Sequence, residues 1–188
     1  MGAGQLIIFV HGVGLDRFMW CPVVDELKQE FTCVTFDLLG HGQAPDIEGT
    51  VSIKKFTGRL LTLIEEFQPI KPILVGFSLG AMVVKRFVID NPNLVRGLVI
   101  AHSVFKRNNE QRKAIEKRLD SVQNNGLNGV IEPAIQRWFT GSFIDSKPPI
   151  LERVRQTLLE NNLSNLSLIH ISEPTRPLYI SYAVFCLK

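Results

Sequence analysis

The sequence predicts an α/β fold with a mostly parallel sheet, because buried-type strands alternate with helices and a Gly-x-Ser-x-Gly turn joins one strand to the next helix. Gln5–Val10 is a continuous apolar run rich in β-branched residues, which is typical of a strand covered on both faces. Alternation of such strands with helices indicates a parallel sheet between two helical layers.

The elements follow in regular order. The predicted strands are Gln5–Val10, Thr32–Phe36, Ile73–Val75 and Gly97–Ala101, and the predicted helices are Phe18–Glu30, one that begins after Ser52, and Leu79–Asp90. In the first helix the apolar side is Trp20, Val23, Val24 and Leu27. Ser52 is a suitable N-cap for the second helix, whose apolar face is Ile53, Phe56, Leu60, Leu63, Ile64 and Phe67.

The character of the sequence changes after His102. Lys106–Lys117 is strongly charged, and the stretch from there to Asn165 has helical patterns, polar turns and no strand. We therefore predict an α/β core over residues 1–103 and a helical cap over 104–165 that lies on the sheet.

The last segment, Leu166–Lys188, resembles the forward translation of a transposase-type sequencing-library adaptor. LSLIHISEPTR matches one part of the adaptor, ISYAVFCLK matches the flow-cell end, and three residues fill the barcode position between them. We predict that residues 166–188 are not native, that the reading of the natural chain stops near Asn165, and that His170 and Cys186 carry no role.

Composition excludes several classes of protein. The net charge of +3 is small and dispersed, which argues against nucleic acid and membrane surfaces as partners. No apolar run reaches the roughly 18 residues of a membrane helix. Three scattered cysteines form neither a disulfide framework nor a zinc pattern, and the start has no basic leader. We therefore expect a cytoplasmic protein without a metal.

The chemistry centres on Gly76-Phe-Ser-Leu-Gly80, which follows a strand and opens a helix, as a nucleophile elbow does. In that turn Ser78 takes a strained conformation with its Oγ exposed, and the glycines leave room for close packing. Ser78 is the predicted catalytic nucleophile. The backbone N–H groups of Leu79 and of Val13, which follows the first strand, are the predicted oxyanion hole.

Other polar residues at strand ends have alternative interpretations. Gly12-Val-Gly14 could open a dinucleotide-binding turn with Asp37 as the ribose acid, but Arg17 occupies the third glycine position. We interpret His11, Asp37 and His41 as residues that brace loops rather than as members of a catalytic triad. His102, at the end of the fourth strand, is a candidate lining residue of the pocket.

The segments FVHGVGLDRFMW (Phe9–Trp20), TFDLLGHG (Thr35–Gly42) and VGFSLG (Val75–Gly80) resemble the α/β-hydrolase superfamily, in its cap-bearing branch. The cap is similar to that of 3-oxoadipate enol-lactonases at Arg137–Thr140, and Trp138 is a candidate substrate-binding residue. The resemblance implies a serine hydrolase of carboxylic esters or lactones that forms an acyl-enzyme and needs no cofactor. Its partner would be a small-molecule ester or lactone.

In that superfamily the triad acid and histidine follow the cap, as do the last two strands of the sheet. We therefore expect the 188-residue chain itself to be inactive and aggregation-prone, as a C-terminally truncated fold. A start upstream of Met1 is also expected. Two alternatives stay open: a carbon–carbon bond hydrolase of ring-cleavage products, and a non-catalytic ligand-binding protein on the same fold. The serine at the elbow argues against the branches that use aspartate there.

Overall fold

The computed structural model describes residues 4–103 and 128–161, and isolated residues between these ranges. Its four strands are β1 (Leu6–Val10), β2 (Thr32–Phe36), β3 (Ile73–Phe77) and β4 (Gly97–Ala101). They form one sheet in the order β2-β1-β3-β4, and every neighbouring pair is parallel. The predicted parallel α/β architecture is confirmed.

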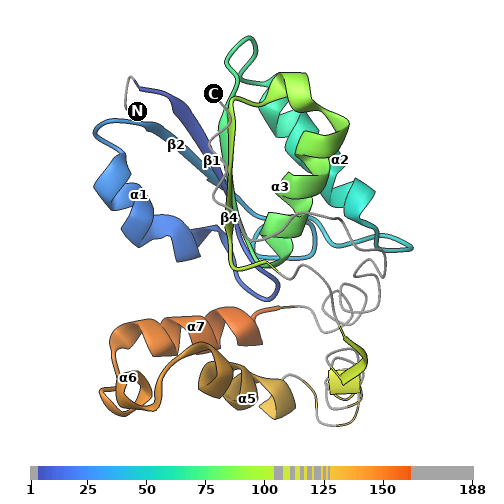
Figure 1. The fold of residues 1–188 in the computed structure, drawn as a ribbon. Helices are drawn as coiled ribbons and strands as arrows, with labels where there is room; N and C mark the ends of the chain where they lie inside the picture. The colour runs from blue at the N-terminus through green and yellow to red at the C-terminus, as the bar shows by residue number, and fades with distance from the viewer. Residues whose placement is uncertain are drawn as a thin grey trace.

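Helices cover both faces of this sheet (Figure 1). The 3-10 helix η1 (Arg17–Trp20) and α1 (Cys21–Leu27) lie on one face, and α2 (Ile53–Glu65) and α3 (Leu79–Asp90) lie on the other. A short 3-10 helix, η2 (Pro92–Leu94), leads into β4.

β1 is buried along its whole length because its alternate side chains enter two different cores. Leu6, Ile8 and Val10 pack with the apolar faces of α2 and α3. Ile7 and Phe9 pack on the opposite face with Trp20 and its neighbours. The continuous apolar run in the sequence is therefore the direct consequence of a strand with no solvated face.

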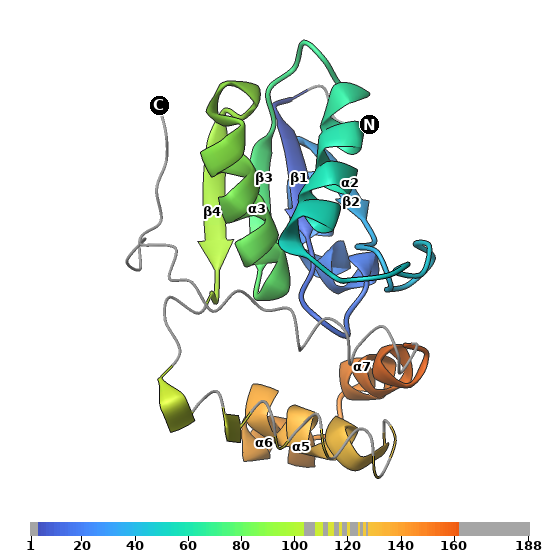
Figure 2. The same cartoon turned by 90° about the vertical axis from the view of Figure 1, so that its right-hand side faces the viewer.

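Three further helices lie beyond the carboxyl ends of the strands, as Figures 1 and 2 both show. They are α5 (Asn128–Trp138), α6 (Gly141–Asp145) and α7 (Pro149–Leu159). A separate apolar cluster joins α5 to α7 and consists of Ile131, Ile135, Leu151 and Leu158. This arrangement agrees with a cap, although the predicted boundaries at 103 and 165 stay predictions.

Several details differ from the sequence prediction. The third strand is two residues longer than expected, and the first helix is split into η1 and α1. Trp20, Val24 and Leu27 follow the α-helical spacing i, i+4, i+7 and pack on the sheet, whereas Val23, at the edge of this face, is 41% exposed. Ser52 precedes α2 in an extended conformation, but its side chain makes no capping hydrogen bond.

Part of the predicted organisation lies outside the described residues. This holds for the whole 166–188 segment and for much of Lys106–Lys117. Among the helices that the structure does describe, none has the length and apolar character needed to cross a bilayer.

The glycines of the β3–α3 turn generate a stability prediction. A Cβ on Gly76 would lie 2.5 Å from the Gly80 carbonyl oxygen and 2.7 Å from the Ala81 Cα, so Gly76→Ala must displace backbone. We expect the free energy of unfolding to fall by about 1–3 kcal/mol in a denaturant titration. The matched control is Gly58→Ala in α2, where nothing lies within 4 Å of the added Cβ. That change should raise the free energy of unfolding by about 0.5–1 kcal/mol. Equal effects of the two substitutions would contradict the packing argument.

Candidate active site

The turn between β3 and α3 places Ser78 at the carboxyl edge of the sheet. Its backbone has φ 52° and ψ −110°, a left-handed conformation that non-glycine residues rarely adopt. The Ser78 N–H donates to the Ala101 carbonyl at 3.2 Å, and the Ser78 carbonyl accepts from the Met82 N–H at 3.2 Å. The strained turn that the sequence predicts is therefore present, and it is held from both sides.

The loop after β1, residues 11–16, is called the β1 loop. It packs directly against the β3–α3 turn because glycines leave no side chain between them. A Cβ on Gly12 would lie 3.3 Å from the Ser78 Cβ and 2.9 Å from the Phe77 ring. A Cβ on Gly80 would lie 2.2 Å from the Val10 carbonyl oxygen. Two loops that are far apart in the sequence thus meet at Ser78.

The two predicted oxyanion donors come from these two segments. Val13 follows Gly12, and Leu79 is the first residue of α3, so its N–H has no partner within the helix. Neither N–H takes part in a hydrogen bond within the described part of the chain. The N-terminus of α3 favours negative charge at this place, and the assignment of the two N–H groups to an oxyanion hole stays a prediction.

His11 is a structural residue, because both of its ring nitrogens are occupied. Nε2 accepts the Leu38 N–H at 2.9 Å, so Nδ1 carries the proton and donates to the Gly12 carbonyl at 2.8 Å. Burial of the ring lowers the pKa of His11 to about 4. A neutral imidazole whose two ring nitrogens are both hydrogen-bonded cannot accept a proton from Ser78.

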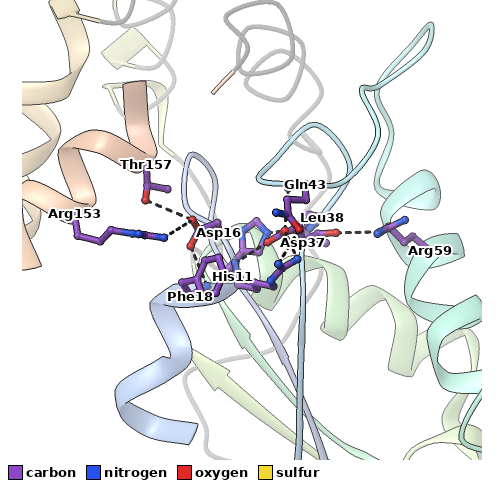
Figure 3. Close-up of polar contacts among 10 residues, drawn as sticks. His11, Asp16, Phe18, Asp37, Leu38, Gln43, Arg59, Arg153 and Thr157 are labelled. Atoms are coloured by element: carbon purple, nitrogen blue, oxygen red, sulfur yellow. Dashed lines mark hydrogen bonds and ion pairs between the residues drawn. The ribbon is translucent and has the colours of Figure 1, made fainter. Parts of the chain in front are cut away.

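Asp37 braces the same region from the end of β2 (Figure 3). Its carboxylate is buried and accepts the Arg17 N–H at 2.8 Å, the Arg17 guanidinium at 3.0 Å and the Gln43 N–H at 3.0 Å. Its carbonyl accepts from Arg59 Nε at 3.0 Å. With its oxygens engaged in this way, Asp37 holds the β1 and β2 loops together, as the sequence indicated.

His41 lies beside His11, with the ring centroids 5.0 Å apart in an edge-to-face arrangement. Its Nδ1 donates to the Leu39 carbonyl at 3.0 Å, and burial lowers the pKa of His41 to about 4. Its buried Nε2 has no partner within the described part of the chain. These contacts support the structural interpretation of His41.

His102 directly follows β4 in a left-handed conformation, with φ 54°, and its side chain is exposed. Its ring stacks on Phe77 with the centroids 5.8 Å apart, so it lies next to the residue that precedes Ser78. No described side chain hydrogen-bonds to Ser78 Oγ. The structure therefore brings His102 near the elbow but assigns no general base.

Trp138 lies at the end of α5 and is 40% exposed. Beside it, Phe139 stacks on Phe143 of α6 with centroids 5.3 Å apart. The predicted contact of Trp138 with substrate stays a prediction. Within the described residues, no group of three or more His, Cys, Asp or Glu could hold a metal ion.

The sequence prediction missed the contact between the β1 loop and α7. Asp16 accepts the Phe18 N–H at 2.9 Å and also lies 3.5 Å from Thr157 Oγ1, which is 141 positions away. The N-cap position of Asp16, directly before the short helix η1, is a recognisable local signal. No local pattern could reveal a partner at that sequence separation.

Comparison with known proteins identifies the family. A family model described as the alpha/beta hydrolase family matches residues 7–177. The chain belongs to the alpha/beta hydrolase family. The parallel sheet, the elbow and the helices beyond the strand ends are thus those of an alpha/beta hydrolase fold.

Two curated relatives come from Acinetobacter baylyi. An (E)-2-((N-methylformamido)methylene)succinate hydrolase is 26% identical over 163 residues, 87% of this chain and 60% of the relative. A 3-oxoadipate enol-lactonase is 24% identical over 156 residues, 83% of this chain and 58% of the relative. The chain therefore spans about 60% of the length of these relatives.

Solved structures agree on the fold. The enol-lactonase from Burkholderia xenovorans LB400 superposes with a TM-score of 0.81 at 19% identity, covering 90% of this chain and 64% of the other. At an identity below 25%, this likeness concerns the fold alone.

The buried imidazoles generate a prediction for the pH dependence of stability. Burial lowers the pKa values of His11 and His41 from 6.5 to about 4, so below pH 6.5 the unfolded chain binds protons that the folded chain does not. The free energy of unfolding should therefore be highest above pH 6.5 and should fall as the pH approaches 4. We expect a loss on the order of a few kcal/mol in all.

The measurement is a set of urea titrations between pH 7 and pH 5, above the range where most carboxylates titrate. His41→Gln is the internal control, because it retains only the contribution of His11 and should show about half of the pH dependence. A free energy of unfolding that stays constant from pH 7 to pH 5 would show that these rings are not held neutral.

Proposed function

We propose that Ser78 is the nucleophile of a serine hydrolase that acts on small carboxylic esters or lactones through an acyl-enzyme. The observation that carries this proposal is the strained elbow, where Ser78 directly precedes α3 and lies against Gly12 of the loop after β1. A structure tolerates such backbone strain chiefly at functional sites. Membership of the alpha/beta hydrolase family and relatives named as hydrolases and enol-lactonases add support.

The proposed reaction follows from that geometry. A histidine takes the Ser78 proton, the alkoxide attacks the substrate carbonyl, and the N–H groups of Val13 and Leu79 stabilise the oxyanion. The bond from the carbonyl carbon to the alcohol oxygen then breaks, and that oxygen takes the proton from the histidine. Water, deprotonated by the same histidine, attacks the acyl-enzyme, which releases the acid and returns the proton to Ser78. Loss of one such donor typically lowers the rate by a factor on the order of 10²–10³.

The base and the acid that orients it are not assigned to any described residue. His11 and His41 are buried and hydrogen-bonded, and nothing described reaches Ser78 Oγ. We therefore propose that the 188-residue chain is inactive by itself. Loss of the base costs serine hydrolases on the order of a million-fold in rate.

The substrate would bind between the sheet edge and helices α5 to α7. Ligands of open α/β sheets bind outside the carboxyl ends of the strands, where these helices lie. The exposed side chains of Trp138 and His102 are the proposed contacts of the substrate in that space.

We also propose that the source DNA, read again through codon 165, encodes a longer chain, and the test compares this longer chain with the 188-residue chain. A fluorophosphonate probe should label Ser78 in the longer chain, and Ser78→Ala should abolish both labelling and ester hydrolysis. The shorter chain should not label. Strong labelling of the shorter chain would overturn the inactivity proposal and place a base within it.

The same experiment separates the alternatives. A longer chain that labels and hydrolyses vinylogous diketones, but neither esters nor lactones, would be a carbon–carbon bond hydrolase. A longer chain that binds small esters without labelling at Ser78 would be a ligand-binding protein, and the proposed function would be wrong.

A further inference from the structure

Helix α7 and Asn161, two residues beyond its end, hold the β1 loop at Gly14. Asn161 Nδ2 donates to the Gly14 carbonyl at 2.9 Å and to the Thr157 carbonyl at 2.6 Å. Leu158 Cδ2 would lie 2.9 Å from a Cβ on Gly14, whose φ is 74°. The loop backbone is therefore in direct contact with α7, and a side chain at Gly14 would prevent that approach.

A second anchor lies two residues further along the loop, at Asp16 (Figure 3). One carboxylate oxygen caps η1 by accepting the Phe18 N–H at 2.9 Å. The other accepts from Thr157 Oγ1 at 3.5 Å and lies 3.8 Å from Arg153 Nη2. Asp16 and Thr157 are both buried, so this contact is shielded from water.

Val13 lies between these anchors and the elbow. On one side Gly12 packs on Ser78, and on the other Gly14 and Asp16 are bound to α7. The position of the Val13 N–H thus depends on the core and on α7 together. A fixed donor stabilises an oxyanion better than a mobile one, because it needs no reorganisation during the reaction.

We propose that Asp16, Thr157 and Asn161 are positioning residues, through which α7 sets the place of the Val13 N–H in the oxyanion hole. This inference rests on the proposed function, since it assigns a catalytic consequence to the contact. Under this proposal, α7 helps to set the geometry of the oxyanion hole and also lies over the proposed substrate site.

The first test needs no activity and uses the longer chain. Thr157→Val removes the hydroxyl but keeps the shape, Asn161→Ala removes the bond to Gly14, and Thr157→Ser restores a hydroxyl. Amide hydrogen exchange is read at Leu15 and Phe18, whose N–H groups bond to the Gly12 carbonyl and to Asp16. We expect exchange about 2- to 10-fold faster in the first two variants and near wild type in Thr157→Ser.

Arg155→Ala is the matched control on the same helix. Arg155 pairs with Glu132 of α5 at 2.6 Å and makes no contact with the loop in the described structure. This variant should leave the exchange of Leu15 and Phe18 unchanged. Unchanged exchange in both Thr157→Val and Asn161→Ala would overturn the proposal, whatever the reactivity of Ser78.

The second test measures steady-state kinetics in the longer chain. Thr157→Val and Asn161→Ala should lower kcat about 10- to 100-fold with little change in KM, because the oxyanion forms only in the transition state. An unchanged kcat, in a protein whose activity Ser78→Ala abolishes, would overturn the positioning role while the proposed function stands. If Ser78 never reacts, the proposed function and the catalytic half of this inference both fail, while faster exchange would still support the anchoring of the loop by α7.

Discussion

The contact between the β1 loop and the β3–α3 turn leaves no room for a side chain, and the rest of the site depends on it. An added Cβ on Gly80 would lie 2.2 Å from the Val10 carbonyl oxygen, and one on Gly12 would lie 3.3 Å from the Ser78 Cβ. This approach is possible only if β1 and β3 are neighbours in the sheet. Because Val13 follows Gly12 and Leu79 follows Ser78, the same contact brings these two residues close together. The candidate oxyanion hole therefore depends on the order of the strands in the sheet.

Around this contact, buried polar side chains hold the loops in place, and the buried carboxylate of Asp37 is paired with Arg17. His11 joins the β1 loop to the β2 loop through Leu38, and Asp37 ties the β2 loop to Arg17. Burying an imidazole is tolerable because it stays neutral and both nitrogens are bonded. Because both nitrogens of His11 are used in these hydrogen bonds, His11 cannot act as a general base. The residue that braces the site is therefore not the residue that would deprotonate Ser78.

The sequence predicts what is encoded locally. The bounds of β2, β4 and α3 match the structure because apolar β-branched runs and the Asn91-Pro92 stop are local signals. The strained Ser78 turn follows from a five-residue motif. Val23 was misplaced because it lies at the edge of the apolar face, where periodicity alone does not separate buried from exposed positions. The contacts of Asp16 with α7 join residues 141 positions apart, and only the folded chain reveals them.

The β1 loop connects two of the three apolar clusters, the one between α5 and α7 and the one under α2 and α3. Leu158 belongs to the cluster that holds α5 to α7, and it also lies against Gly14. Val10, which precedes that loop, belongs to the cluster under α2 and α3. Among the described residues, the β1 loop thus contacts both the sheet core and α7, at positions on either side of Val13, the candidate oxyanion donor. Under the proposed function, a change in α7 would therefore alter the geometry of this donor as well as the helices beyond the sheet edge.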